Sequence, residues 1–467
     1  MSSENTNLQL QIFRDGAISD SKSYPIYLNK VEVNGGDSLL RQFFSKLLSP
    51  LVKESDYTLV HLIEKVNQSA DNLRRTGVFG EVKPSLHADY THVRPLLRSY
   101  NLENPIVTNV IFDLESKDLS TGNFSLGFND EDNLIVNLGY DNNNFNHNAE
   151  AVKFGVNYRP YKPSERLVST MRLESFLKCP AFRFVLDLHN AHDNNQTSFQ
   201  HARKALGGVM GIFYANEEGS ISVFNGFSLI RRSTSLPEEI SKDQHQSFGG
   251  DFLKSSIVTR LMYNKTRTMG DYINDGIRLR LNNEIAIDQK QTGVHEAQNT
   301  FVKTEGSLDL YKSLMENRIT ANIFMNSGII FGGVSSDHVH VSDRFYLGGS
   351  DSFKGFSRNA VNEEGGLQFY KFGATAFGKI PSFLRPANFS SPDPMRMYVT
   401  GMVGNVGYDI TREKGVMSVG IGLRYTNQMV KMDAGYYFSQ RLGSSSDHGV
   451  KDGFKLELTL GGIANTQ

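Results

Sequence analysis

The stretch GFKLELTL, Gly453–Leu460, alternates strictly between apolar and polar side chains. Its apolar members are Phe454, Leu456, Leu458 and Leu460, with Lys455, Glu457 and Thr459 between them. Successive side chains of a β-strand point to opposite faces, so the pattern predicts a strand with one apolar and one polar face. The apolar face must then be covered by a second layer of protein or by lipid.

Segments of the same kind recur from about Thr121 onward, and no convincing helix interrupts them. Clear examples are NLIVNLGY (133–140), AVKFGVNY (151–158), AFRFVLDL (181–188), SVGIGLRY (418–425) and VKMDAGYYF (430–438). We count about sixteen, each close to the roughly 9–11 residues that a tilted strand needs to cross a bilayer. The pattern predicts an all-β transmembrane barrel of about 16 antiparallel strands over residues 121–467, with lipid outside and a wet lumen.

A large soluble β-sandwich or a β-propeller is the alternative to a barrel. A propeller would show a repeat of about 40–50 residues with a shared motif, and we find none in this sequence. A sandwich rarely needs so many strands in one run. A closed barrel is favoured because closure leaves no sheet edge unpaired.

The composition argues against several other classes of protein. With 49 basic and 50 acidic residues the net charge is −1, without the basic excess of a nucleic-acid binder. Cys179 is the only cysteine, so neither an intrachain disulfide nor a cysteine-based metal site is expected. No apolar run approaches the length of a membrane helix. The polar start MSSENTNLQL predicts no secretory signal.

The first part of the chain has a mixed pattern. Residues 1–24 are polar and are expected to be flexible, and residues 25–118 are predicted to form a small α+β domain. Within it, Pro25–Val33 and Asn104–Ser116 alternate as strands, and Leu59–Leu73 carries an apolar stripe at helical spacing. The predicted order β-α-α-β-β gives a three-stranded sheet.

The stretch FYLGGSDSFKGFS, Phe345–Ser357, is rich in glycine and aromatic residues. A phosphate-binding loop requires lysine directly after its last glycine, whereas Lys354 precedes Gly355 and Phe356 follows it. The competing interpretation is a loop that packs against the inside of a container, since glycine permits sharp turns and close backbone approach. The predicted barrel supplies that container.

This loop resembles the signature loop of the outer-membrane barrel-assembly superfamily, G-G-x-x-S-hydrophobic-[RK]-G-F. The matching residues are Gly348, Gly349, Ser352, Lys354, Gly355 and Phe356. The resemblance implies that a loop around residues 333–366 folds from the barrel rim into the lumen, where its basic residue touches polar groups on the inner wall.

The family's matching wall strand carries F-x-[DN]-x-G, and Val403, Asn405 and Gly407 resemble it. The resemblance therefore points to Asn405 and Gly407 as the loop contact on the inner wall. The family usually has arginine where Lys354 stands, and lysine lacks the bidentate fork of arginine. With a neutral Asn405 opposite, we expect a neutral hydrogen bond in place of a strong ion pair.

The domain at 25–118, with LRRTGVFGEV at Leu73–Val82, resembles a POTRA (polypeptide-transport-associated) domain. A single such domain without a secretory signal resembles the mitochondrial branch of the superfamily, the central barrel subunit of the sorting and assembly machinery. The ending KDGFKLEL, with Lys451, Gly453, Leu456 and Leu458, is similar to the sorting signal of mitochondrial barrel precursors. An ordinary final strand would also match so loose a pattern often.

The resemblance implies insertion and assembly of β-barrel precursors into the mitochondrial outer membrane, as a multi-pass barrel whose POTRA domain faces the intermembrane space. The implied partners are the precursors, companion subunits of the machinery and membrane lipid. A lateral gate would lie between the first and last strands. Its expected residues are Asn123, Phe124, Ser125, Leu126, Gly127 and Phe128 on the first strand, and Lys451, Gly453, Phe454, Leu456, Leu458 and Leu460 at the last. A short first strand containing Gly127 should make few ladder bonds, so this seam should need less free energy to open than any other pair of strands.

The rival functions are a porin-like solute pore and a secretion pore that conducts a soluble protein. Nothing in the sequence argues for an enzyme, and we expect no cofactor and no nucleic-acid partner. His338 and His340 share one face of an extended segment, but a third ligand is missing nearby, so no metal site is expected.

Overall fold

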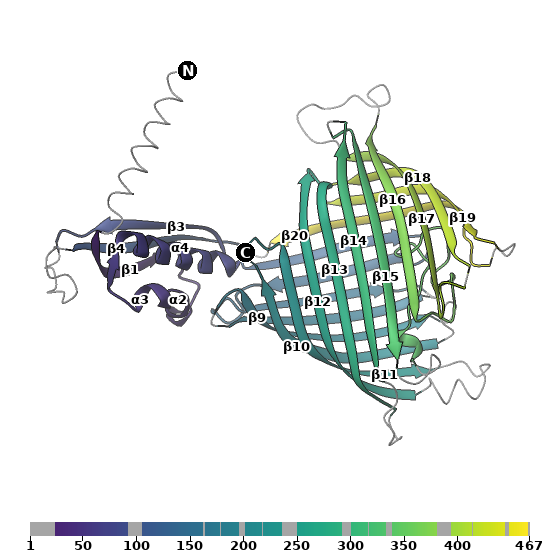
Figure 1. Ribbon diagram of the computed structural model, residues 1–467, viewed down its shortest axis with the longest axis horizontal. Coiled ribbons are helices and arrows are strands. Elements are labelled where there is room, and N and C mark those ends of the chain that lie inside the picture. Colours follow the sequence, from purple (N-terminus) through teal and green to yellow (C-terminus); the bar gives the residue numbers. More distant parts are fainter. Residues whose placement is uncertain are drawn as a thin grey trace.

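The computed structural model describes residues 24–91, 105–161, 164–177, 179–195, 201–216, 218–235, 250–291, 300–315, 317–332, 339–380, 394–412, 414–443 and 448–465. Two units follow one another along the chain, a small N-terminal α+β domain and a large closed barrel (Figure 1). The segment 1–24 lies outside the described residues except for Tyr24. Among the helices of the described ranges, none is long and apolar enough to span a membrane.

The N-terminal domain packs helices against one β-sheet. Its elements are β1 (Pro25–Asn34), α2 (Arg41–Leu47), α3 (Ser49–Val52), β2 (Asp56–Thr58), α4 (Leu59–Arg75), β3 (Phe79–Ala88) and β4 (Ile106–Ser116). The sheet order is β2-β1-β4-β3, with β1 and β4 parallel and the other neighbours antiparallel. The expected three-stranded sheet is therefore wrong by one strand. β2 has only three residues, too few to show an alternating pattern.

Helix α4 supplies the longest helical face of the domain core. Its apolar stripe at three- and four-residue spacing buries Leu62, Val66, Ala70 and Leu73. Thr58 caps the N-terminus by accepting a hydrogen bond from the backbone N–H of His61 at 3.4 Å. Gly77, at φ +75°, follows the C-terminus in the left-handed conformation that commonly ends helices.

Sixteen strands close into the barrel, which confirms the predicted fold class. They are β5 (Ser120–Asn129), β6 (Asn133–Asn142), β7 (Ala151–Arg159), β8 (Ser164–Phe176), β9 (Phe182–Asn195), β10 (His201–Ala215), β11 (Ile221–Ser235), β12 (Gly250–Met269), β13 (Tyr272–Gln291), β14 (Phe301–Leu314), β15 (Ile319–Gly332), β16 (Gln368–Lys379), β17 (Met395–Gly407), β18 (Val416–Thr426), β19 (Val430–Arg441) and β20 (Gly453–Asn465). Each strand pairs antiparallel with its neighbour in sequence, and β20 closes the ring on β5.

The alternation of the sequence becomes two faces of the barrel wall. On the outer face, large apolar side chains stay exposed, for example Phe454 at 62%, Phe438 at 60% and Ile421 at 53%. On the inner face of the same strands lie polar groups such as Asp433 and Ser418, which are buried. An apolar exterior around a polar interior suits a barrel surrounded by lipid.

The seam between β5 and β20 is not unusually short. It aligns nine residue pairs, from Glu457 opposite Asn129 to Asn465 opposite Thr121. The described ladders between β6 and β7 and between β19 and β20 align seven and eight. The expectation of a short first strand that makes few ladder bonds is therefore wrong, because β5 is a full ten-residue strand.

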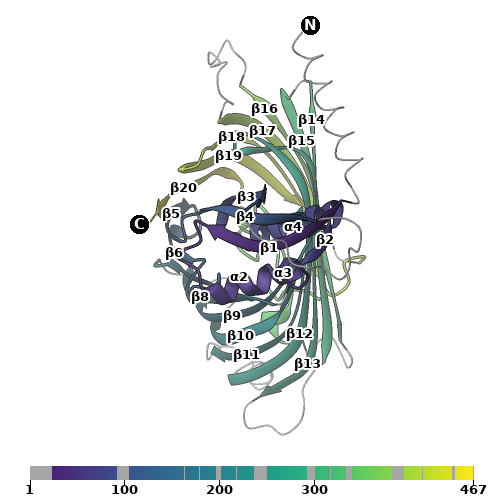
Figure 2. The same ribbon diagram turned by 90° about the vertical axis from the view of Figure 1, so that its left-hand side faces the viewer.

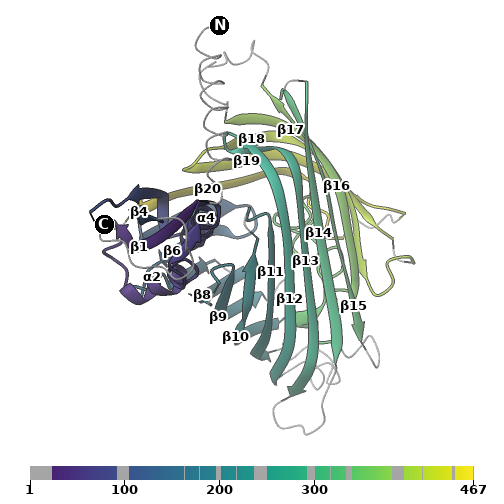
Figure 3. The same ribbon diagram turned by 60° about the vertical axis from the view of Figure 1, so that its left-hand side comes forward.

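The N-terminal domain is joined to the barrel by hydrogen bonds near the β6–β7 turn and β9. The backbone N–H of Leu40 donates to the carbonyl of His147 at 2.9 Å, and Asn144 donates to the carbonyl of Ser38 at 3.0 Å. Arg183 on β9 donates to the carbonyl of Arg75 at the end of α4, at 3.1 Å. In Figure 2 the domain lies in front of the barrel with strands around it, and Figure 3 shows it at one side of the barrel.

Candidate functional site: the lumen loop and the seam

The segment between β15 and β16 folds into the barrel and packs against its inner wall. Its described part runs from Val339 to Gly366 and contains the 3₁₀ turn η2 (Val341–Asp343) near its start. Residues 333–338 lie outside the described residues. We call residues 339–366 the lumen loop. Its apolar side chains form one buried cluster with wall residues of β17 and β18; the cluster includes Leu347, Phe353, Phe356, Met402, Val406 and Val416.

The glycine of the motif's K-G-F core is required by close approach to the wall. Gly355 has φ +95°. A Cβ atom there would lie 1.7 Å from Oγ of Ser439 on β19 and 2.9 Å from Oγ of Ser418 on β18. A side chain at this position would collide with the wall, so glycine allows the backbone of the loop to lie directly on β18 and β19.

Lys354, the basic residue of the motif, forms ion pairs with two carboxylates of the wall. Its ammonium lies 3.2 Å from Glu457 on β20 and 3.6 Å from Asp433 on β19. The expected partner, Asn405, and the expected neutral hydrogen bond are therefore wrong. Burial disfavours the charged ammonium, but Asp433 and Glu457 outweigh burial and raise the pKa of Lys354.

Asp433 is also the centre of a hydrogen-bonded group on the inner wall. It accepts from the hydroxyl of Tyr398 at 2.6 Å and from Nε of Arg424 at 2.9 Å. The hydroxyls of Tyr398 and Tyr437 lie 2.8 Å apart. These wall residues come from β17, β18 and β19, so Lys354 is received by a group of polar side chains already held in place.

Asn405 alternates along β17 with Met402 and Val406, the members of the loop cluster on this strand. Alternation puts it on the face of β17 that carries Val399 and Val403, which are 52% and 38% exposed. Asn405 itself is buried and accepts from the backbone N–H of Val406 at 2.9 Å. Because a strand alternates, Asn405 cannot share the inner face with Met402 and Val406 without a bulge.

Gly407, the second expected wall contact, does meet the loop. The backbone at Gly366 lies so close that a Cβ there would be 2.4 Å from the backbone nitrogen of Gly407. One residue earlier on β17, the carbonyl of Val406 accepts from the amide of Asn362 at 3.3 Å. The loop therefore meets the end of β17 through backbone groups.

A second anchor holds the start of the lumen loop to β11 and β12. Asp343 of η2 accepts from both terminal nitrogens of Arg232, at 2.7 and 2.9 Å, and from Lys254 at 2.8 Å. Burial disfavours the charge of Asp343, but Arg232 and Lys254 outweigh burial and hold its pKa well below its usual range. The sequence does not predict this anchor, since its three residues lie in segments that show no shared motif.

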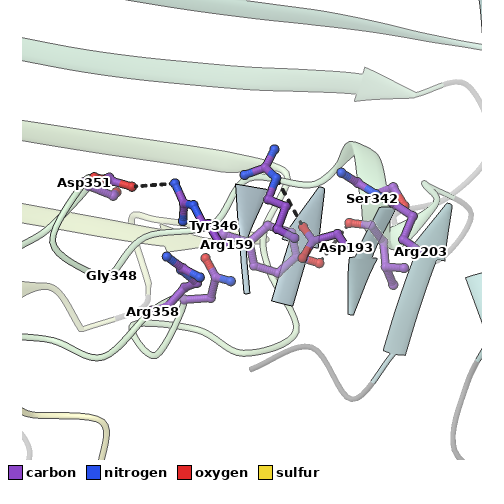
Figure 4. Close-up of a pocket in the computed structure, with 12 residues that line it drawn as sticks. Arg159, Asp193, Arg203, Ser342, Tyr346, Gly348, Asp351 and Arg358 are labelled. Atoms are coloured by element: carbon purple, nitrogen blue, oxygen red, sulfur yellow. Dashed lines mark hydrogen bonds and ion pairs between the residues drawn. The ribbon is translucent and has the colours of Figure 1, made fainter. Parts of the chain in front are cut away.

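An arginine-rich cavity of about 290 Å³ lies between the loop and the wall (Figure 4). Its lining includes Arg159, Arg203 and Arg358, and Figure 4 shows the ion pair between Arg159 and Asp351. Next to it, the fully buried Asp132 of the β5–β6 turn pairs with Arg159 at 2.6 Å and with Arg358 of the loop at 2.7 Å. The loop is thus held from several sides of the lumen.

The expected gate residues lie on β5 and β20 except for Lys451, and the β5 ladder begins at Glu457, after Gly453, Phe454 and Leu456. The structure places Phe124 opposite Gly462, Leu126 opposite Leu460 and Phe128 opposite Leu458. The remaining members of the first-strand set pair as Asn123 with Ile463, Ser125 with Gly461 and Gly127 with Thr459. Gly453 opens β20, and Lys451 just before it donates its backbone N–H to the carbonyl of Gly355 at 2.8 Å. Loop and last strand therefore touch at the motif itself.

The two wall carboxylates could have been found from the sequence, although not from the family motif, because each follows the alternating pattern of its strand. Asp433 stands between Met432 and Ala434, and Glu457 between two leucines, so both occupy the polar face of an alternating strand. Acidic residues at such positions face the lumen, where a loop lysine needs a partner.

No group of three or more histidine, cysteine, aspartate or glutamate residues in the described ranges could hold a metal ion.

Comparisons with known proteins agree with this geometry. A family model described as the Omp85 superfamily domain matches residues 120–436. BamA from Haemophilus ducreyi lacking POTRA domains 1–3 superposes with a TM-score of 0.70 at 13% identity, over 94% of this chain and 85% of that one. CdiB from Acinetobacter baumannii superposes with a TM-score of 0.57 at 13% identity, over 94% of this chain and 74% of that one. CdiB from Escherichia coli superposes with a TM-score of 0.50 at 10% identity, over 94% of this chain and 91% of that one. No match was found among the curated proteins.

The structural likenesses, at such low identity, show a shared fold: a BamA-like closed barrel. The family match is stronger, because it runs from the first barrel strand into β19 and spans the lumen loop with its K-G-F motif. The chain therefore belongs to the Omp85 superfamily.

Proposed function

We propose that this chain inserts and assembles β-barrel precursor proteins in the mitochondrial outer membrane. Clients would pair with the edge strands exposed when the seam between β5 and β20 parts, and would leave sideways into the lipid. The chain would act without chemical catalysis, together with companion subunits. Superfamily membership supports the general role, an outer-membrane barrel that handles other proteins.

The observation that carries the proposal is the seam itself. β5 and β20 are the two ends of the barrel strand order and are joined by pairing alone, without a connecting turn. A strand entering lipid must have its N–H and C=O groups paired, because no water is available there. Parting β5 from β20 exposes two edges to which a client strand can add by β-augmentation.

The mitochondrial location rests on the C-terminal pattern. Lys451 precedes β20, Gly453 opens it, and Leu456 and Leu458 share the outer face with the exposed Phe454. This arrangement suits a sorting signal of polar, glycine and hydrophobic residues. The N-terminal α+β domain, proposed as a POTRA domain of residues 25–118, would then face the intermembrane space and receive clients.

Site-directed photo-crosslinking in isolated mitochondria tests the proposal. A photoreactive amino acid at Leu126 or Leu460, which pair across the seam, should crosslink a radiolabelled barrel precursor during its assembly. The matched control is Ile257 on β12, an exposed outer-face residue halfway around the ring from the seam. Equal labelling at Ile257 and at the seam, or none at the seam, would contradict insertion at this site.

A conducting pore for solutes or for a protein is the second candidate. It is favoured by open space in the lumen, with cavities of about 290 and 260 Å³ beside the loop and one of about 370 Å³ along the wall strands β9–β14. A pore should give a steady conductance in planar bilayers whether or not clients are present. Client-independent flux, together with normal barrel assembly in mitochondria depleted of this chain, would favour the pore over the assembly role.

A further inference from the structure

The lumen loop crosses the seam on the inside of the barrel. A cavity of only about 10 Å³ separates three segments: the β5–β6 turn at Asp130 and Glu131, the loop at Ser350 and Lys354–Phe356, and β20 at Lys455–Glu457. A space of that size barely admits one water molecule. The loop therefore lies directly against the first hairpin and the last strand at once, at the end of the seam where Glu457 faces Asn129.

On the first-hairpin side, the contacts run to carboxylates of the β5–β6 turn. Glu131 accepts from the backbone N–H of Ser350 at 3.2 Å, and Asp132 pairs with Arg358 at 2.7 Å. Gly349, at φ +97°, permits this approach, since a Cβ there would lie 2.9 Å from a carboxylate oxygen of Glu131.

On the last-strand side, the contacts include the backbone. Lys451 donates its N–H to the carbonyl of Gly355 at 2.8 Å, and Ser357 donates its N–H to the carbonyl of Gly449 at 2.9 Å. Phe356 forms an isolated β-bridge with Val450. These backbone bonds make the loop a continuation of the β19–β20 hairpin, and the ion pair of Lys354 with Glu457 adds to them.

We propose that the lumen loop is an inner clasp of the seam, which stays with the β19–β20 hairpin and releases the β5–β6 hairpin when the barrel opens. The client-assembly experiment below rests on the assembly role proposed above. Glu131, Asp132 and Arg358 are then positioning residues of the gate. They set whether the first hairpin is held closed, and they need not touch a client.

The partners of Asp132 show why the clasp breaks on this side. Its two arginines lie on opposite sides of the break, because Arg159 belongs to β7 and moves with the first hairpin, whereas Arg358 belongs to the loop. Release therefore leaves the buried carboxylate with one cation, and avoids the large penalty of an unpaired buried charge. Separating the loop from the β19–β20 hairpin would instead leave backbone groups at Gly355 and Ser357 without their hydrogen-bond partners, and Glu457 without the cation of Lys354.

Reversible crosslinking of each side tests the clasp. Cys179 is exposed and is first replaced by serine. In that background, Ser350→Cys with Glu131→Cys is bridged by a short bis-methanethiosulfonate reagent, which forms a reducible disulfide with each thiol and ties the loop to the first hairpin without touching the seam strands. The matched control is Glu363→Cys with His448→Cys, an exposed hydrogen-bonded pair whose Nε2 and Oε1 atoms lie 3.0 Å apart and which joins the loop to the β19–β20 turn.

We expect the 350–131 bridge to reduce client assembly at least tenfold, reduction to restore it, and the 363–448 bridge to leave it unchanged. Normal assembly with the 350–131 bridge in place would overturn the clasp. A block by both bridges would overturn the claim that the loop stays with the last strand.

A second readout needs no client and keeps the clasp separate from the proposed function. Amide hydrogen exchange of β5 in the purified barrel should rise at least tenfold in Arg358→Gln, with β12 and β13 unchanged, and Arg358→Lys should restore most of the protection. Unchanged exchange at β5 would overturn the clasp whatever the client assay shows. Raised exchange in a protein that assembles no client in any form would instead retain the clasp and remove the assembly role.

Discussion

Replacing Lys354 by alanine tests how the lumen loop is held. The Lys354 side chain is 16% exposed, and its ammonium pairs with Asp433 and Glu457 at 3.6 and 3.2 Å. Removing one partner of a wholly buried ion pair costs about 3–5 kcal/mol. Here the loss should be smaller, because Asp433 keeps Arg424 and Tyr398 and Glu457, at 32% exposed, can recover water. We expect Lys354→Ala to lower the free energy of unfolding by about 2 kcal/mol.

The measurement is urea unfolding in lipid vesicles, followed by far-UV circular dichroism, since the chain has no tryptophan. Lys312→Ala is the matched control, because Lys312 pairs with Asp275 at 3.4 Å while 74% exposed, and such a pair contributes at most about 1 kcal/mol. Lys354→Arg should keep near-normal stability, since arginine retains the charge and can reach both carboxylates.

A double-mutant cycle decides whether the ion pair itself is responsible. Glu457→Gln combined with Lys354→Ala should be less destabilised than the sum of the two single variants, with a coupling of about 1 kcal/mol or more. A coupling near zero, or a loss with Lys354→Ala no larger than with Lys312→Ala, would refute the reasoning. The position would then matter for packing alone.

Three further predictions follow from other parts of the structure. Burial opposes the charge of Asp132, but Arg358 and Arg159 outweigh it and lower its pKa. The stabilisation is thus complete above the unfolded pKa of about 3.9 and is lost as pH falls through the lower folded value. The protection factors of the β5 amides, which correct for the pH dependence of intrinsic exchange, should therefore be flat from pH 7 to about 5 and fall below about 4, and a fall already at pH 6 would contradict this assignment. Gly355→Ala should prevent normal packing of the loop, since its Cβ would meet Ser439, and should lower assembly, whereas normal protease resistance of the loop would contradict the close approach. Carbonate extraction should leave the chain in the membrane pellet, and recovery in the supernatant would contradict a membrane barrel.

The barrel could be predicted from the sequence because its physical cause is local. Each strand carries its own alternation, as in Gly453–Leu460, so the number of strands and the position of the change near Thr121 are readable one segment at a time. Strand β2 escapes prediction for the same reason, since three residues show no period. The loop motif predicts which segment enters the lumen, because glycines beside aromatic residues imply close packing.

The partners of the loop could not be predicted in the same way. Lys354 meets Asp433 and Glu457 only because the closed ring brings β19 and β20 under the loop, and ring register is not a local property. Asn405 is suggested by resemblance to a motif, although alternation along β17 already separates it from the face of Met402 and Val406, against which the loop packs. The seam is longer than the sequence suggests because β5 begins three residues before Asn123, within a turn-like stretch of small polar residues.

The seam disulfide is the most direct test of the central claim, that clients pass between β5 and β20. The register supplies two adjacent pairs, Gly127 with Thr459 and Leu126 with Leu460. Adjacent pairs of an antiparallel ladder differ in hydrogen bonding and in spacing, so one of the two suits a disulfide better. With Cys179→Ser as background, the bridged barrel should remain folded and membrane-embedded, fail to assemble a radiolabelled precursor, and recover on reduction. A bridged seam that still assembles clients at the normal rate would contradict lateral passage at this site.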